Sequence, residues 1–162
     1  MEFTGDELAG VVDLFGGLTR GELSEALAEL AYRQGESYDA SAFAEGIDEA
    51  IRTYHLVAVD AGALDAVVDE PLLLAGPLSF PTLPTDARDL PHILDIEARS
   101  VSTDAVGPTV AEMFREDARA AIEAGDADRI ETLLDASYEL EPWADVTLTG
   151  IREELAGATQ TN

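Results

Sequence analysis

One short segment of the chain combines side chains that can bind a divalent metal or transfer protons. Its four candidate residues are Asp89, His92, Asp95 and Glu97. Imidazole and carboxylate groups are the ligands open to a chain without cysteine, and together they could serve a small metal-dependent hydrolase as acid and base. Their spacing matches no motif with a known mechanism, and so acidic a chain places carboxylates near any histidine by chance. We therefore favour a structural His92 that holds a turn or pairs with Asp89 or Asp95.

Other catalytic chemistry is largely excluded by what the chain lacks. It has no cysteine, which rules out disulfides, thiolate catalysis and cysteine-ligated zinc. It also has no lysine, and its glycines match neither a dinucleotide-binding fingerprint nor a P-loop. We expect a protein that is not an enzyme, with no catalytic residue and no cofactor.

The elements that would position any site begin with three amphipathic helices. Apolar residues recur at helical spacing over residues 8–15, 23–30 and 43–54, with acidic residues between them. Thr19 and Glu22 form a T-x-x-E capping box, which is typical of a helix start. Each helix is expected to bury one face and to leave the other in solvent.

Two short apolar runs follow the helices. Residues 56–59 and 72–75 are typical of strands, and the acidic residues 60–70 join them. The order helix, helix, helix, strand, loop, strand makes residues 1–76 resemble a winged-helix domain, with the third helix as the recognition helix and the loop as the wing. This resemblance implies a scaffold able to bind DNA. The DNA-contact candidates on it are Arg20, Arg33, Ser41 and Arg52.

Prolines mark the middle of the chain. Six of the seven lie from Pro71 to Pro108, and each removes a backbone donor and restricts the preceding residue. Regular helix is therefore not expected here. Apolar side chains between the prolines predict a packed connector over residues 77–107, with residues 93–98 as a candidate short strand.

Helical periodicity returns over residues 108–157. It predicts a helical domain made of an antiparallel hairpin, with Tyr138 in its core, a break at Pro142 and Trp143, and one more short helix. The polar residues 158–162 predict a disordered tail. The expected fold class is mainly α with a small β component: a winged-helix-like N-terminal half plus a C-terminal helical hairpin.

Charge is the most unusual property of the chain. Its 34 Asp and Glu outnumber nine Arg, for a formal net charge of -25. Exposed like charges repel across a Debye length of about 8 Å in physiological salt, which molar salt shortens to about 3 Å. We interpret the acid excess as adaptation to a saline cytoplasm, with salt cations at the acidic surface. The acidic start and the absence of a long apolar run predict a cytoplasmic protein without membrane contact.

The same charge disfavours DNA as a partner. Lys and Arg that meet phosphates supply most of the affinity for DNA, whereas the exposed face of the third helix offers Glu45, Asp48 and Glu49 against Arg52. We expect a non-enzymatic protein-interaction or regulatory module that acts through a protein partner or self-association. A winged-helix transcription regulator that binds DNA in high salt is the alternative, and the metal-dependent hydrolase is the second alternative.

Several stretches of the chain resemble a known family. They are LAGVVDLFGGLTRGELSEAL, GPLSFPTLP, DLPHILDIEAR and LLDASYELEPW. Together with the lysine-free, acidic composition, they resemble a family of uncharacterised proteins from halophilic archaea, nearly from end to end. This resemblance implies no activity and carries over no functional residue.

Overall fold

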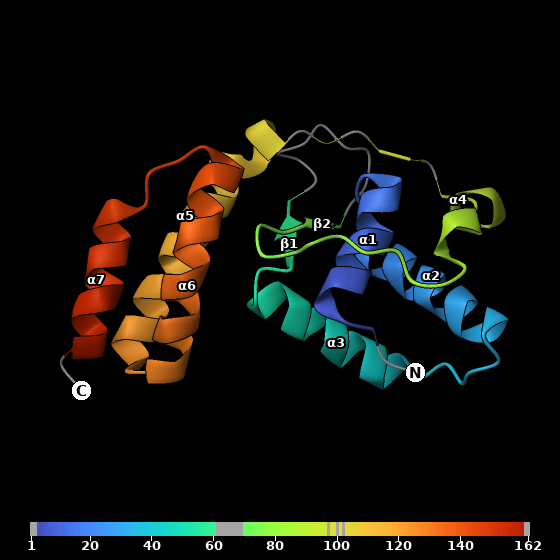
Figure 1. Cartoon of the computed structure of the whole chain (residues 1–162), viewed down its shortest axis with the longest axis horizontal. Coiled ribbons are helices and arrows are strands. Elements are labelled where there is room, and N and C mark those ends of the chain that lie inside the picture. Colours follow the sequence, from blue (N-terminus) through green and yellow to red (C-terminus); the bar gives the residue numbers. More distant parts are fainter. Residues whose placement is uncertain (1–2, 61–69, 97, 100, 102, 161–162) are drawn as a thin grey trace. The chain divides into compact units, whose positions relative to one another are not determined.

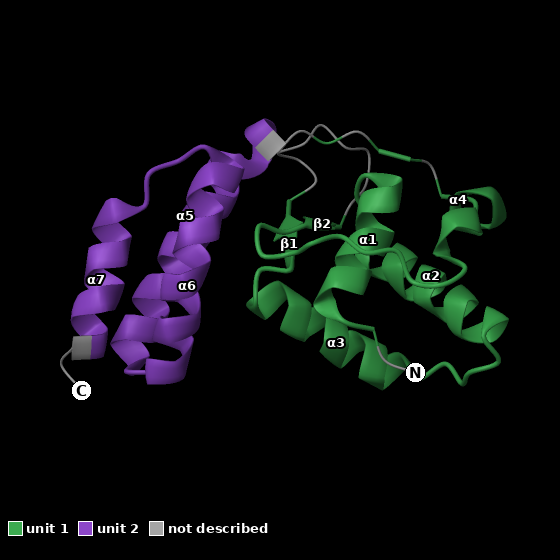
Figure 2. Ribbon diagram, viewed as in Figure 1, with its two compact units in different colours: residues 1–101 green, residues 102–162 purple. Residues whose placement is uncertain are grey.

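The computed structural model describes residues 3–60, 70–96, 98–99, 101 and 103–160. The chain divides into two compact units, residues 1–101 and residues 102–162, and each is described by itself (Figure 2). Both units are built mainly from helices, and the first also holds a small antiparallel sheet. The mainly α fold class with a small β component is therefore confirmed.

Three helices form most of unit 1 (Figure 1): α1 (Gly5–Phe15), α2 (Arg20–Arg33) and α3 (Ala40–Arg52). The predicted capping box opens α2, where the Thr19 side chain accepts from the Glu22 N–H at 3.1 Å and Glu22 accepts from the Thr19 N–H at 2.9 Å. Such a box satisfies backbone donors that have no partner inside the helix. The three predicted helices are confirmed.

The two predicted strands pair as an antiparallel sheet. Strand β1 (Leu56–Val59) lies against β2 (Leu72–Ala75), with Leu56 opposite Ala75. A further bridge joins the turn between α1 and α2 to this sheet. Leu18 N donates to Leu73 O at 3.1 Å, and Leu73 N donates to Leu18 O at 2.7 Å. The helical turn is thereby fixed to the sheet edge by backbone hydrogen bonds.

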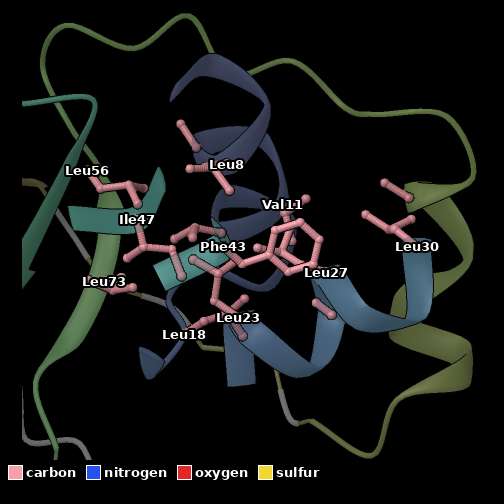
Figure 3. Packing of buried hydrophobic residues seen from close by; sticks show 14 of the residues in the cluster. Leu8, Val11, Leu18, Leu23, Leu27, Leu30, Phe43, Ile47, Leu56 and Leu73 are labelled. Atoms are coloured by element: carbon pink, nitrogen blue, oxygen red, sulfur yellow. The ribbon is translucent and has the colours of Figure 1, made fainter. Parts of the chain in front are cut away.

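The core of unit 1 lies where the three helices meet the sheet. Its apolar stripes come from α1, α2 and α3 and are closed by β1 and β2 (Figure 3). The labelled members are Leu8, Val11, Leu18, Leu23, Leu27, Leu30, Phe43, Ile47, Leu56 and Leu73. Burial of a leucine side chain contributes about 1.5–3 kcal/mol, so this shared core holds the helices in place.

Most of the proline-rich segment packs on unit 1. Its backbone crosses α1, where Thr82 N donates to Asp6 O at 3.0 Å. A side chain at Gly10 would meet Thr82 O at 2.1 Å, so only glycine permits this close approach. Ala87 and Leu90 are fully buried in the core. The connector was predicted over residues 77–107; its residues up to 101 fall in unit 1, and the boundary between the two units, at residues 101–102, lies within it.

Local structure within this segment differs from the prediction. A short 3-10 helix, η2 (Ala87–Asp89), leads into the one-turn helix α4 (Leu90–Ile93), where the prolines were expected to prevent helix. Pro91 lies at the start of α4, where its missing N–H would have no helical partner in any case. The described residues between 93 and 98 form no strand, so the candidate strand is wrong.

Unit 2 consists of α5 (Thr103–Ala124), α6 (Ala127–Ala144) and α7 (Thr149–Gln160). The helical hairpin is present, but all three helices extend beyond their predicted bounds. Pro108 and Pro142 lie inside α5 and α6. Each proline removes one helical hydrogen bond, and buried neighbours in the same helix offset that loss. Residues 158–160, predicted as disordered, complete α7. Over the described residues, none of the helices has the length and apolar character to cross a membrane.

Candidate functional site

The predicted metal site is not assembled in the described part of the chain. Asp89, His92 and Asp95 are all exposed around α4, and no group of three or more His, Asp or Glu among the described residues is close enough to hold a metal ion. The fourth candidate, Glu97, lies outside the described residues. The structure therefore gives no geometry on which a hydrolytic mechanism could be built.

The exposed side of α3 is the surface on which the sequence placed the recognition helix of a winged-helix domain. We call it the α3 face. Its exposed residues are Ser41, Ala44, Glu45, Asp48, Glu49 and Arg52. Three carboxylates stand there against one guanidinium. The α3 face is thus acidic, as the sequence predicted. The wing residues Asp65 and Asp69 lie outside the described residues.

Each arginine proposed to contact DNA already has an acidic partner. Arg20 pairs with Asp48 at 2.5 Å between nitrogen and oxygen, Arg33 with Glu29 at 3.2 Å, and Arg52 with Glu49 at 3.7 Å. The fourth candidate, Ser41, lies in the first turn of α3 beside the capping carboxylate of Asp39, which accepts its backbone N–H. These pairs are exposed and contribute about 0–1 kcal/mol each. They nevertheless place a carboxylate beside each guanidinium that a phosphate would have to reach.

A second polar cluster, which sequence reasoning missed, closes the turn between α1 and α2. Arg99 donates from Nη1 to Gly17 O at 3.0 Å and to Glu22 Oε1 at 2.6 Å, and from Nη2 to Glu22 Oε2 at 3.1 Å. Its backbone N donates to Phe15 O at 2.6 Å. Such bidentate, charge-assisted bonds are stronger than neutral ones. We call this arrangement the Arg99 clamp, and it fastens the end of unit 1 to the helical turn.

The clamp changes the acidity of Glu22. Partial burial raises the pKa of this carboxyl. Hydrogen bonds from Arg99 and Thr19, together with the positive charge of Arg99, outweigh burial and hold the pKa below its ordinary value of 4.5. A carboxyl with a lower pKa in the folded state stabilises the fold above its unfolded pKa, and this contribution is lost as pH falls through the folded value. The clamp is therefore a source of acid sensitivity.

We expect Glu22→Gln to make unfolding less dependent on pH. The variant should unfold more readily than the wild type near pH 7, and the difference should shrink as pH falls from 7 through the ordinary carboxyl pKa of 4.5 and below. Denaturant unfolding in molar KCl across this range measures it. Glu25→Gln is the matched control, because Glu25 is exposed on the same helix and has no ion pair with a described residue. Equal behaviour of the two variants would contradict a role for the clamp.

Unit 2 holds an arginine cluster of similar design. Arg152 Nε donates to the hydroxyl of the fully buried Ser137 at 3.0 Å, and its Nη2 donates to the Glu141 carboxylate. Its guanidinium carbon lies 4.3 Å from the centre of the Tyr138 ring. Tyr138 is 58% exposed beneath this guanidinium, so its predicted place in the core is wrong. Arginine stacks favourably on aromatic faces, which explains a large ring at the surface.

The Glu141 carboxylate also joins α6 to α7. It accepts the Leu148 N–H at 2.7 Å, and this bond, followed by that from Arg152, lowers the pKa of Glu141. Together with the Arg99 clamp, this cluster uses arginine to hold segments together. Within the described residues, seven of the nine arginines form ion pairs, which leaves little positive charge for an anionic ligand.

Comparison with known proteins gives one result. A family model described as "Family of unknown function (DUF7109)" matches residues 6–160. No curated protein and no solved structure matches the chain. The predicted resemblance to an uncharacterised family is confirmed at this level, and no functional residue is carried over from it.

Proposed function

The chain belongs to the family of unknown function DUF7109, and we propose that it is a non-enzymatic protein-interaction module on a winged-helix scaffold. It works in a saline cytoplasm and takes part in regulation by holding a protein partner.

The connections within unit 1 support the winged-helix scaffold. A short bridge at Leu18 follows α1, then come α2 and α3, and β1 and β2 form a hairpin. In this order Leu18 takes the place of a first strand, reduced to one bridge on β2. The α3 helix then occupies the position of a recognition helix. This placement makes the α3 face the natural contact surface.

The charge of the α3 face is the observation that favours a protein over DNA. A duplex presents one phosphate charge for every 1.7 Å or so of its axis. Glu45, Asp48 and Glu49 would meet this charge with like charge, and Arg52 is already paired with Glu49. A partner surface that carries arginine or lysine is complementary to the same face. Repulsion between two acidic faces also disfavours a second copy docked through α3.

DNA binding is the alternative that the same scaffold suggests, and a direct assay separates the two. We expect no saturable rise in the fluorescence anisotropy of a labelled, randomised duplex in molar KCl. The same result is expected at each lower salt concentration at which the protein remains folded. Binding that Arg52→Glu abolishes would reverse this conclusion, because it would place phosphates against α3.

Partner binding is tested by crosslinking in a lysate of the source cells at molar salt. We expect the double variant Asp48→Arg and Glu49→Arg to lose at least one crosslinked protein that the wild type retains. The matched control is Glu153→Arg with Glu154→Arg, since these exposed residues on α7 give the same change of charge in unit 2. Identical crosslinked proteins for wild type and both variants would contradict a partner at the α3 face.

A further inference from the structure

A cavity opens at the N-terminal part of α3, on the side turned toward the core. It has a volume of about 270 Å³. Its lining comes from α1, α2, α3 and the segment before α1: Phe3, Leu8, Leu27, Ala42, Phe43, Glu45 and Gly46. Figure 3 shows the Phe43 ring beside Leu27. A cavity of about 150 Å³ is enough to admit benzene, so this one has room for a small aromatic ligand with a short side chain.

Gly46 contributes to this space. It lies in the interior of α3, where glycine weakens a helix relative to alanine, and a Cβ there would meet no atom within 4 Å. At Gly10, by contrast, a passing backbone explains the missing side chain. Gly46 lines the cavity, and no packed neighbour excludes a side chain there.

The chemistry of the lining selects one class of ligand. The ring centres of Phe3 and Phe43 lie 5.6 Å apart at 53°, and those of Tyr38 and Phe43 lie 5.2 Å apart at 58°. Aromatic faces attract cations. Glu45 adds a carboxylate to the lining and forms no ion pair with a described residue. Apolar walls, aromatic rings and one unpaired acid together suit a cation with an apolar body.

We propose that this cavity binds a small organic cation, an aryl- or alkylammonium whose apolar part enters between Phe3, Leu27 and Phe43 and whose ammonium group meets Glu45. This goes beyond the proposed interaction function. Glu45 belongs both to the cavity lining and to the α3 face, so the small molecule would bind beside the surface that meets a protein partner.

The test uses three ligands of similar size that differ in charge: phenethylammonium, 2-phenylethanol and phenylacetate. Each is titrated into 15N-labelled full-length protein in molar KCl, and amide shifts are followed. We expect saturable shifts confined to the cavity lining. The dissociation constant should be about fivefold to tenfold lower for the cation than for the neutral alcohol. The difference comes from one exposed ion pair between the ammonium group and Glu45 and from the contact of the cation with an aromatic ring. Phenylacetate should bind more weakly than either.

Two variants locate the site. Gly46→Leu should fill the cavity and abolish the shifts for all three ligands, while Gly46→Ala, which leaves most of the space, should keep them. Glu45→Gln should remove the preference for the cation, and Glu25→Gln, an exposed acid on α2 that also forms no ion pair with a described residue, should not.

Three results would overturn the proposal: no saturable shifts in the wild type, shifts that persist in a folded Gly46→Leu variant, or equal affinity for the cation and the alcohol. If Gly46→Leu does not fold, the comparison between Glu45→Gln and Glu25→Gln still decides, because each changes only an exposed charge without an ion partner among the described residues. None of these results depends on whether a protein partner binds the α3 face.

Discussion

Transfer from molar KCl to low salt is expected to unfold the protein, and restored KCl should refold it. The cause is repulsion within a chain of net charge -25. Both units share it: 20 acids face five arginines in residues 1–101, and 14 face four in residues 102–162. A like-charged neighbouring pair on a helix costs about 0.2–0.5 kcal/mol. Summed over so many acids, this reaches several kcal/mol, comparable to the whole stability of about 5–15 kcal/mol of a typical domain.

Near-UV circular dichroism across a KCl titration measures this transition. Sucrose is the control, because it favours the compact state without screening charge. If repulsion is the cause, sucrose should restore less structure than KCl, and Glu153→Gln with Glu154→Gln should shift the midpoint to lower salt. A spectrum that is identical at low and molar salt would contradict the proposed saline adaptation.

Gly16→Ala is expected to destabilise unit 1 far more than the same change at Gly35. Both glycines follow a helix with positive φ, 82° at Gly16 and 70° at Gly35. A Cβ at Gly35 would meet nothing within 4 Å, whereas at Gly16 it would lie 1.6 Å from Arg99 O. Gly35→Ala should therefore cost only the left-handed backbone, about 1–2 kcal/mol. Gly16→Ala adds a steric conflict of about 1–3 kcal/mol, for a total of about 2–5 kcal/mol.

Denaturant unfolding of the two variants in molar KCl measures this difference. The difference measures how firmly the segment at Arg99 is held against the rest of unit 1. Relief of the clash would require the Arg99 backbone to move away from Phe15, whose carbonyl accepts the Arg99 N–H at 2.6 Å. Equal costs for the two variants would show that this segment yields easily and that the Arg99 clamp contributes little.

Local signals explain what could be predicted of the fold. Thr19 and Glu22 are three residues apart and form their capping box within one helical turn. The apolar stripes of α1 to α3 likewise depend on spacing alone. The predictions around prolines were less accurate than those from apolar spacing. How much a proline destabilises a helix depends on its position in that helix. Pro91 starts a helix, and Pro108 and Pro142 lie within helices whose buried neighbours hold them.

The candidate site likewise has features that follow from local sequence and features that do not. The acidic character of α3 follows from its residue types, since an exposed helix face can be derived from periodicity. The ion pair between Arg20 and Asp48 joins residues 28 positions apart, and the Arg99 clamp joins residues 77 positions apart. No spacing rule relates such residues. Only the packed chain showed that Arg20 pairs with Asp48, whereas the pairs of Arg33 with Glu29 and of Arg52 with Glu49 join residues four and three positions apart on one helix.

By itself, the sequence determined the charge, the absence of lysine and cysteine, and the helices with their buried and exposed faces, because these depend on composition and on neighbours within a turn or two. The tertiary structure alone decided that most of the proline-rich segment belongs to unit 1, that Leu18 joins the sheet, and that a cavity opens beside Gly46. Each of these requires segments distant in the chain to meet, and that meeting depends on how apolar faces pack together in three dimensions.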